Sequence, residues 1–145
     1  GVEFDIAGEV LTDLNLSLGL TDFSISGDET VSNYTPSTLV KAAALYKPSA
    51  MLGLSFGLNV RWQASTSRLQ GTVADGFDNA GSDIVSRQEA YAIADLLIKY
   101  EINDDLTVNF NVFNIGDEKY LTSLYWAQSY YGAPRSFSAS VNWLF

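Results

Sequence analysis

The sequence contains no cysteine and no histidine among its 145 residues. Without cysteine the chain can form neither a disulfide framework nor a thiolate metal site. The absence of both residue types also removes the common zinc ligands and most nucleophile–base pairs of covalent catalysis. No pair of carboxylates has a spacing that marks it for acid–base catalysis. We therefore expect no catalytic residues, no metal site and no cofactor, and we predict that the chain is not an enzyme.

Charged residues and long apolar runs are also scarce. Only 17% of the residues are charged, and the net charge is −9, with the 8 Lys and Arg scattered along the chain. A surface that binds nucleic acid needs clustered cations, so nucleic acid is not an expected partner. No run approaches the roughly 18 apolar residues of a transmembrane helix. The chain opens in a strand pattern without a signal peptide, and we expect its N-terminus to arise from processing or from truncation of a longer protein.

What the sequence does contain is regular alternation of apolar and polar residues. At the end of the chain the apolar residues Phe137, Ala139, Val141, Trp143 and Phe145 alternate with Ser136, Ser138, Ser140 and Asn142. A period of two indicates a β-strand, because successive side chains leave a strand on opposite faces. The same pattern predicts about seven strands in all, within residues 2–10, 14–21, 40–46, 52–63, 92–101, 106–112 and 136–145.

The connections between these strands alternate in length. Short turns are predicted at residues 11–13, 47–50 and 103–105, and long loops at residues 27–37, 67–87 and 116–133. Short turns at one rim and long loops at the other are typical of outer-membrane β-barrels. With seven strands, the N-terminus is predicted at the long-loop rim and the C-terminus at the short-turn rim.

Alternation alone also fits a soluble β-sandwich, so a soluble β-sheet binding module remains an alternative. Two further features favour the membrane. The polar faces carry mainly Ser, Asn, Thr and Gly rather than Lys and Glu. Aromatic residues recur at strand ends, where an interfacial girdle would place them: Tyr46, Trp62, Tyr100, Trp143 and Phe145. We predict an all-β fold, an antiparallel up-and-down transmembrane β-barrel segment with Val141 facing lipid and Ser140 facing the lumen.

Two segments near the C-terminus resemble motifs of a known family. The segment that precedes the last long loop resembles the N-x-F-[ND]-x-x-D-x-x-Y pattern of TonB-dependent outer-membrane receptors; it reads Asn111-Val112-Phe113-Asn114-Ile115-Gly116-Asp117-Glu118-Lys119-Tyr120. The lead-in to the terminal strand, Tyr130-Tyr131-Gly132-Ala133-Pro134-Arg135, is similar to their GxPR pattern. Residues 1–5 and 34–36 also fit segments further upstream in that family. The details are closest to the ferric-siderophore branch.

The resemblance implies that residues 1–145 are roughly the C-terminal third of a 22-stranded barrel, without the plug domain and the TonB-binding segment. The implied function is that of an outer-membrane receptor segment for TonB-dependent uptake of ferric siderophores, inactive by itself, because seven strands cannot close in the usual antiparallel way. The implied partners are a ferric siderophore, the lipid bilayer with lipopolysaccharide, the barrel-assembly machinery through the strand ending at Phe145, and TonB only through the missing N-terminal region. An alternative is a small outer-membrane barrel with structural or adhesive loops, which needs an eighth strand, within residues 67–87.

The candidate ligand-binding residues are of two kinds. Tyr125, Trp126, Tyr130 and Tyr131 lie in the last long loop, where they fit either an aromatic wall for a siderophore or loop packing. Arg61 and Gln63, with Arg68, approach the outer rim on the lumen-facing register. They could attract an anionic ferric complex, or pair with neighbours such as Asp95 or Glu101. Arg135 is expected to form a salt bridge or anchor a loop. Asp75, Asp78 and Asp83 do not have the spacing of an EF-hand, and we expect a solvated acidic loop there.

Overall fold

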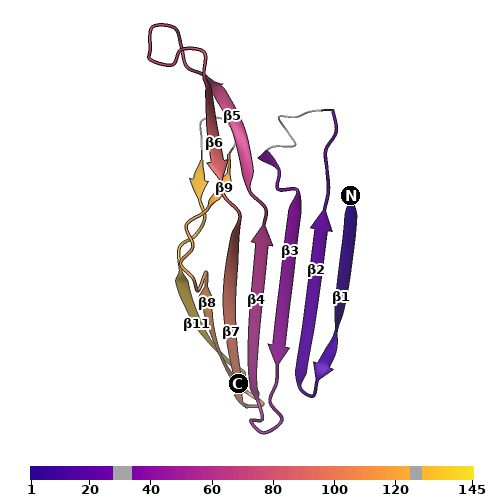
Figure 1. Cartoon of the computed structure of the whole chain (residues 1–145). Coiled ribbons are helices and arrows are strands. Elements are labelled where there is room, and N and C mark those ends of the chain that lie inside the picture. Colours follow the sequence, from indigo (N-terminus) through magenta and orange to yellow (C-terminus); the bar gives the residue numbers. More distant parts are fainter. Residues whose placement is uncertain (28–33, 125–128) are drawn as a thin grey trace.

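The computed structural model describes residues 1–27, 34–124 and 129–145, which form one antiparallel sheet and two small hairpins. The main sheet has seven strands: β1 (Val2–Leu11), β2 (Leu14–Asp22), β3 (Thr38–Tyr46), β4 (Leu54–Gln63), β7 (Tyr91–Asn103), β8 (Leu106–Phe113) and β11 (Ser136–Trp143). They follow the chain in an up-and-down order (Figure 1). In the described ranges no helix is long and apolar enough to cross a membrane.

Each of the seven strands predicted from alternation is present, with small differences at its ends. The fourth strand begins at Leu54 rather than at residue 52, because Gly53 adopts a positive φ of 80° in the preceding turn. An ordinary side chain at Gly53 would overlap the carbonyl oxygen of Glu101, so the turn needs glycine here. The terminal strand ends at Trp143, and the Leu144 N–H donates to the carbonyl oxygen of Asp105 at 2.9 Å.

The strand register places apolar side chains in continuous rows on one face of the sheet. One row runs across five strands, through Ile6, Leu18, Ala42, Val60 and Ala94. The opposite face has matching rows of smaller and more polar residues, such as Ala7, Ser17, Ala43, Asn59 and Asp95. The sheet is therefore apolar on its outer face and mostly polar on its inner face.

No protein layer covers the apolar face in the described part of the chain. Ile93 and Leu124 are the buried apolar side chains there, whereas Val141 and Phe137 are 66% and 64% exposed. A soluble sandwich would bury such a face against a second sheet about 10 Å away. The exposed apolar face instead suits a sheet whose outer surface contacts lipid, which counts against the soluble alternative.

The two ends of the sheet differ as the loop lengths predicted. Figure 1 shows the short turns and the C-terminus at one end, and the long connections at the other, toward which β1 begins. At the short-turn rim, Asp13 joins two turns: its Oδ2 accepts the Ser49 N–H at 2.7 Å, and its carbonyl accepts the Lys47 N–H at 2.9 Å. Asp13 has a φ of 69°, a left-handed conformation that Asp tolerates better than most residues.

The predicted loop at residues 67–87 is instead a hairpin of β5 (Thr66–Thr72) and β6 (Asp83–Gln88) that projects beyond the main sheet (Figure 1). These strands pair with each other and form a separate two-stranded sheet. They do not supply the eighth strand that a small closed barrel would need. The predicted loop at residues 116–133 likewise contains two short paired strands, β9 (Leu121–Ser123) and β10 (Tyr130–Tyr131).

The main sheet does not close on itself. β1 and β11 are its edge strands, and each pairs on one side only. Because direction alternates along seven antiparallel strands, β1 and β11 run the same way and cannot pair antiparallel with each other. The fold is thus an open segment of a barrel wall.

Candidate functional site

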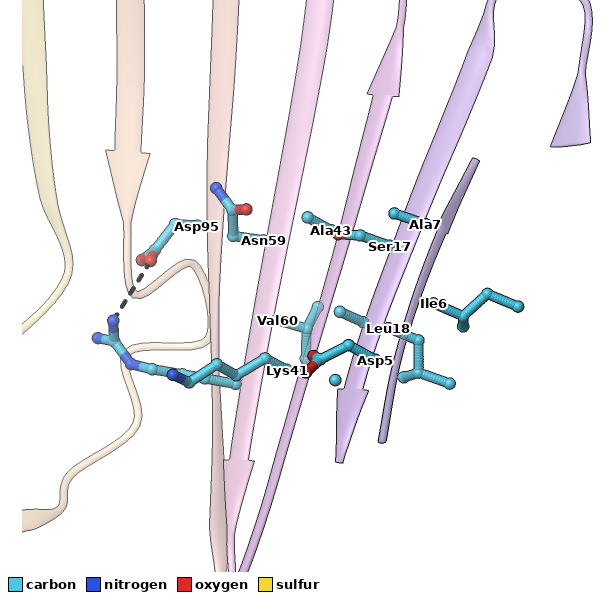
Figure 2. Close-up of a pocket in the computed structure, with 13 residues that line it drawn as sticks. Asp5, Ile6, Ala7, Ser17, Leu18, Lys41, Ala43, Asn59, Val60 and Asp95 are labelled. Atoms are coloured by element: carbon cyan, nitrogen blue, oxygen red, sulfur yellow. Dashed lines mark ion pairs between the residues drawn. The ribbon is translucent and has the colours of Figure 1, made fainter. Parts of the chain in front are cut away.

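The inner face carries a group of charged side chains on the central strands of the sheet, toward its long-loop end. Arg61 on β4 lies with its Nη1 3.8 Å from Oδ2 of Asp95 on β7, and Lys41 on β3 is directly opposite Arg61. Figure 2 shows Lys41, Asn59 and Asp95 extending to one side of the sheet, with Ile6 and Leu18 on the other.

The Arg61–Asp95 ion pair is weak. The side chains are 57% and 21% exposed. Exposed pairs of this kind contribute about 0.2–1 kcal/mol. Of the two alternatives that the sequence left open for Arg61, pairing with a neighbour such as Asp95 is present in the structure. Because this pair is weak, the guanidinium could turn to a ligand at small cost, and ligand contact stays a prediction.

A hollow of about 470 Å³ opens around these residues on the inner face (Figure 2). Its volume lies within the roughly 300–1,000 Å³ of small-molecule sites. The carboxylate of Asp5 lies over Gly19, in the space that a side chain at this position would need: a Cβ added at Gly19 would be 2.7 Å from Asp5 Oδ1. The inner-face residues that line it are Asp5, Ala7, Ser17, Gly19, Lys41, Ala43, Asn59, Arg61 and Asp95.

Gln63 joins Arg61 at a second, smaller hollow of about 110 Å³ toward the long-loop rim. Lys41 and Tyr91 also line it. The structure thus brings together Arg61 and Gln63, the two ligand candidates on β4, although their contact with a ligand stays a prediction. Sequence reasoning did not select Lys41 or Tyr91 as ligand candidates, because their positions beside Arg61 and Gln63 depend on the strand register.

Arg68 is not part of this group. It lies on β5, and its guanidinium carbon is 4.8 Å from the centroid of the Tyr34 ring. Such a cation–π contact contributes from about 0.5 kcal/mol at exposed sites to about 2 kcal/mol when desolvated, and Arg68 and Tyr34 are both half-buried. Arg68 therefore helps to hold the projecting hairpin against the segment that precedes β3.

The aromatic candidates are in the last long loop. Tyr130 and Tyr131 form β10 and are 60% and 76% exposed. Tyr125 and Trp126 lie outside the described residues. Exposed aromatic rings at the long-loop rim are compatible with a ligand wall, and this role also stays a prediction.

Asn114 ties the two ends of this loop together. Its side chain is buried, and it adopts a left-handed backbone conformation with a φ of 50°. Its Nδ2 donates to the carbonyl oxygens of Glu118 at 3.0 Å and Ala133 at 3.1 Å, and its Oδ1 accepts the Glu118 N–H at 2.9 Å. One amide group therefore bridges the start and the end of the loop.

Asp117 and Arg135 make a second connection across the same base. The Arg135 N–H donates to Asp117 Oδ1 at 2.9 Å, and its Nη1 donates to the Ile115 carbonyl at 3.3 Å. Its Nη2 also lies 4.0 Å from Asp117 Oδ2. These contacts are those of a salt bridge and loop anchor, as expected from the sequence.

Tyr120 provides an aromatic contact for the loop base. Its ring stacks on Tyr91, with centroids 4.5 Å apart, and the Gly132 N–H donates to its carbonyl at 2.8 Å. Any Cβ at Gly132 would overlap the Tyr120 ring. The motif residues Asn114, Asp117, Tyr120, Gly132 and Arg135 thus hold the loop base together, which explains their spacing in structural terms.

Metal ligands do not gather anywhere in residues 1–27, 34–124 and 129–145. No group of three or more acidic side chains in those ranges is arranged to hold a metal ion, and this includes Asp75, Asp78 and Asp83.

Comparison with known proteins identifies similar chains. Residues 1–115 match the family model described as TonB dependent receptor-like, beta-barrel. The chain is 29% identical over 150 residues to the ferripyoverdine receptor of Pseudomonas aeruginosa, covering 100% of this chain and 18% of that receptor. It is 26% identical over 149 residues to the ferric-pyoverdine 358 receptor of Pseudomonas putida, covering 100% of this chain and 17% of the relative.

A solved structure is similar to this chain as well. The pyoverdine outer membrane receptor FpvA from Pseudomonas aeruginosa PAO1, bound to pyoverdine, superposes with a TM-score of 0.79 at 28% sequence identity. The match covers 99% of this chain and 21% of that chain. The chain therefore spans about a fifth of the length of the proteins it resembles.

Proposed function

The chain belongs to the TonB-dependent receptor β-barrel family, and from this premise we propose that it is the C-terminal third of the barrel of an outer-membrane receptor that imports ferric siderophores. Two relatives are named as receptors for ferric pyoverdines. We infer that the complete receptor takes a ferric chelate of the same class. We assign transport to the complete receptor and not to this segment. The open sheet leaves the backbone groups along the free edges of β1 and β11 unpaired, and unpaired backbone groups are costly in lipid.

The observation that carries this proposal is that the two faces of the sheet differ. One face is apolar and uncovered, and the opposite face has a hollow lined by charged residues. The apolar rows give the sheet a surface suited to lipid, and the inner face offers Arg61 in a weak ion pair. A barrel wall with these two faces separates a membrane from a water-filled passage that can receive a polar chelate.

Within the proposed receptor, the ligand contacts fall at the long-loop end of the wall. Arg61 and Gln63 would meet the chelate from β4, and Tyr130 and Tyr131 from β10. Their neighbours Tyr125 and Trp126 belong to the same proposed aromatic wall. Arg61 supplies positive charge, whereas the aromatic rings supply apolar contact area.

The other proposed partners follow from the same placement. The outer face would contact the lipid bilayer and, in the outer leaflet, lipopolysaccharide. The terminal strand β11 would be the part that the barrel-assembly machinery meets. TonB would act through a region of the receptor that lies outside this chain, and would energise release of the bound chelate.

The test uses cells that express the complete receptor containing this segment and lack other receptors for the probe. Uptake of radioactive iron is measured with ferripyoverdine from Pseudomonas aeruginosa as the probe and ferric citrate as the comparison chelate. We expect receptor-dependent and TonB-dependent uptake of ferripyoverdine. Equal uptake with and without the receptor for each chelate, at normal receptor levels in the outer membrane, would contradict the proposal.

A further inference from the structure

We propose that Lys41, Arg61, Gln63 and Tyr91 form a subsite for an anionic oxygen group, and that in the receptor this group is a carboxylate of the ferric chelate. All four residues line the hollow of about 110 Å³ near the long-loop rim, together with the apolar residues Leu39, Val40 and Trp62. The inference rests on the proposed function, because it assigns one part of the chelate to one place on the barrel wall. It adds Lys41 and Tyr91 to the site and states which chemical group they recognise.

The sheet brings two like charges together. Lys41 and Arg61 are directly opposite each other on β3 and β4. Like charges at opposed positions of an antiparallel pair destabilise a sheet. An anion placed between the two cations would remove this repulsion and accept charge-assisted hydrogen bonds from both.

The neighbouring carboxylates offset the charge of this pair only in part. Asp95 already accepts the Asn114 N–H through Oδ1, and its Oδ2 is 3.8 Å from Arg61. A charge-assisted hydrogen bond between the Arg61 guanidinium and the Asp95 carboxylate would be about 2.7–2.9 Å long, so the 3.8 Å contact is an ion pair without such a bond. Within the described ranges Lys41 forms no ion pair. The carboxylate of Asp5 leans over Gly19 of the intervening strand β2, but it is not within ion-pair distance of Lys41.

Neutral hydrogen-bond donors lie beside the two cations. Gln63 is the next inner-face residue after Arg61, and it lies opposite Tyr91 on β7. The Gln63 amide offers two N–H donors and the Tyr91 phenol offers one. The Tyr91 ring is held by its stacking on Tyr120. An anion in the hollow would therefore meet donors from β3, β4 and β7 in a fixed arrangement.

The experiment compares Lys41→Gln and Arg61→Gln with Lys99→Gln in the complete receptor, folded in detergent. Lys99 is a suitable control because it also lies on the inner face, but it bonds to Glu101 near the short-turn rim. Each substitution removes one positive charge. Binding of ferripyoverdine is titrated for each variant, and thermal unfolding is followed with and without inorganic phosphate as a simple anionic probe.

Without any ligand, Lys41→Gln should raise the folded-to-unfolded ratio by up to about fivefold, because it removes the like-charge repulsion. Lys99→Gln should not raise it, because it loses an ion pair. Phosphate should stabilise the unmodified receptor and the Lys99→Gln variant, but not the Lys41→Gln variant. Ferripyoverdine affinity should fall about tenfold or more in Lys41→Gln and Arg61→Gln, as expected for loss of a charged hydrogen-bond donor.

The outcomes separate the two proposals. If the unmodified receptor binds ferripyoverdine but Lys41→Gln binds it as tightly as Lys99→Gln does, the subsite is wrong and the proposed function stands. If the unmodified receptor does not bind ferripyoverdine, the proposed ligand class is wrong, and the subsite is then decided by the phosphate and stability measurements alone. A loss of ligand-free stability in Lys41→Gln would overturn the subsite, since it would mean that Lys41 has a structural counterion.

Discussion

The backbone N–H of Asn114 donates to Oδ1 of Asp95 at 2.8 Å, and this bond fastens the base of the last long loop to the inner face of β7. The other oxygen of Asp95 faces Arg61 at 3.8 Å. One carboxylate therefore contacts both the loop anchor and the proposed ligand site. The two contacts differ in strength: the bond to the largely buried loop base is short, whereas the ion pair is long and half-exposed.

Replacement of Asn114 by Ala should loosen the loop base. The change removes three hydrogen bonds of a buried side chain and leaves the polar groups of Glu118 and Ala133 without their partner, so we expect a loss of about 1–3 kcal/mol in unfolding free energy. Faster amide hydrogen exchange at residues 117–124 and 129–135 would report the change. Asn109→Ala is the control, because that half-buried side chain has a single 3.3 Å bond to Ser140. Equal effects of the two substitutions would contradict the anchoring role.

Replacement of Gly132 by Ala should displace Tyr120. The new methyl group would overlap the Tyr120 ring, and overpacking of this kind costs about 1–3 kcal/mol. We expect the Tyr91–Tyr120 stack to open, with a change in near-ultraviolet circular dichroism. Gly116→Ala is a matched control in the same loop, since no atom lies within 4 Å of its added Cβ. An unchanged spectrum in Gly132→Ala would show that the ring contact is not needed.

The two faces of β11 should respond differently to charge. Val141→Arg places a charge on the outer face, where the residue is opposite Val108, and should cost about 2–4 kcal/mol if the site lies near the bilayer midplane. Ser140→Arg, on the inner face opposite Asn109, should cost much less. Urea titration of the complete receptor folded into vesicles measures both variants. Equal costs would mean that the faces have been assigned the wrong way round.

Asp95 should matter more for stability than Arg61. Asp95→Ala removes the acceptor of the Asn114 N–H, whereas Arg61→Gln removes a half-exposed ion pair and, with it, the repulsion between Arg61 and Lys41. We expect a loss of about 1–3 kcal/mol for the first change and at most about 1 kcal/mol for the second. A double-mutant cycle on chemical unfolding should give a coupling below about 1 kcal/mol. A larger coupling would show that the ion pair is a strong structural contact and that Arg61 is not available to a ligand.

Much of this arrangement follows from local sequence pattern. Alternation with a period of two predicted the seven main strands, and the loop lengths predicted which rim each terminus occupies. Asp95, which pairs with Arg61, was one of the neighbouring carboxylates that the sequence suggested as a partner. The hairpin of β5 and β6 was missed, because the register shifts between Leu69 and Gly71 and this irregularity weakens the alternating pattern.

By itself, the sequence determined that the chain is built of strands with one apolar face, because side-chain alternation is a property of neighbouring residues and needs no knowledge of the fold. The tertiary structure decided which strands pair and in what register. Lys41 meets Arg61, and Asn114 reaches Ala133, 19 residues away along the chain, only once β3 has aligned with β4 and the last loop has folded back. These contacts join residues distant in sequence, and their geometry depends on the register of the whole sheet.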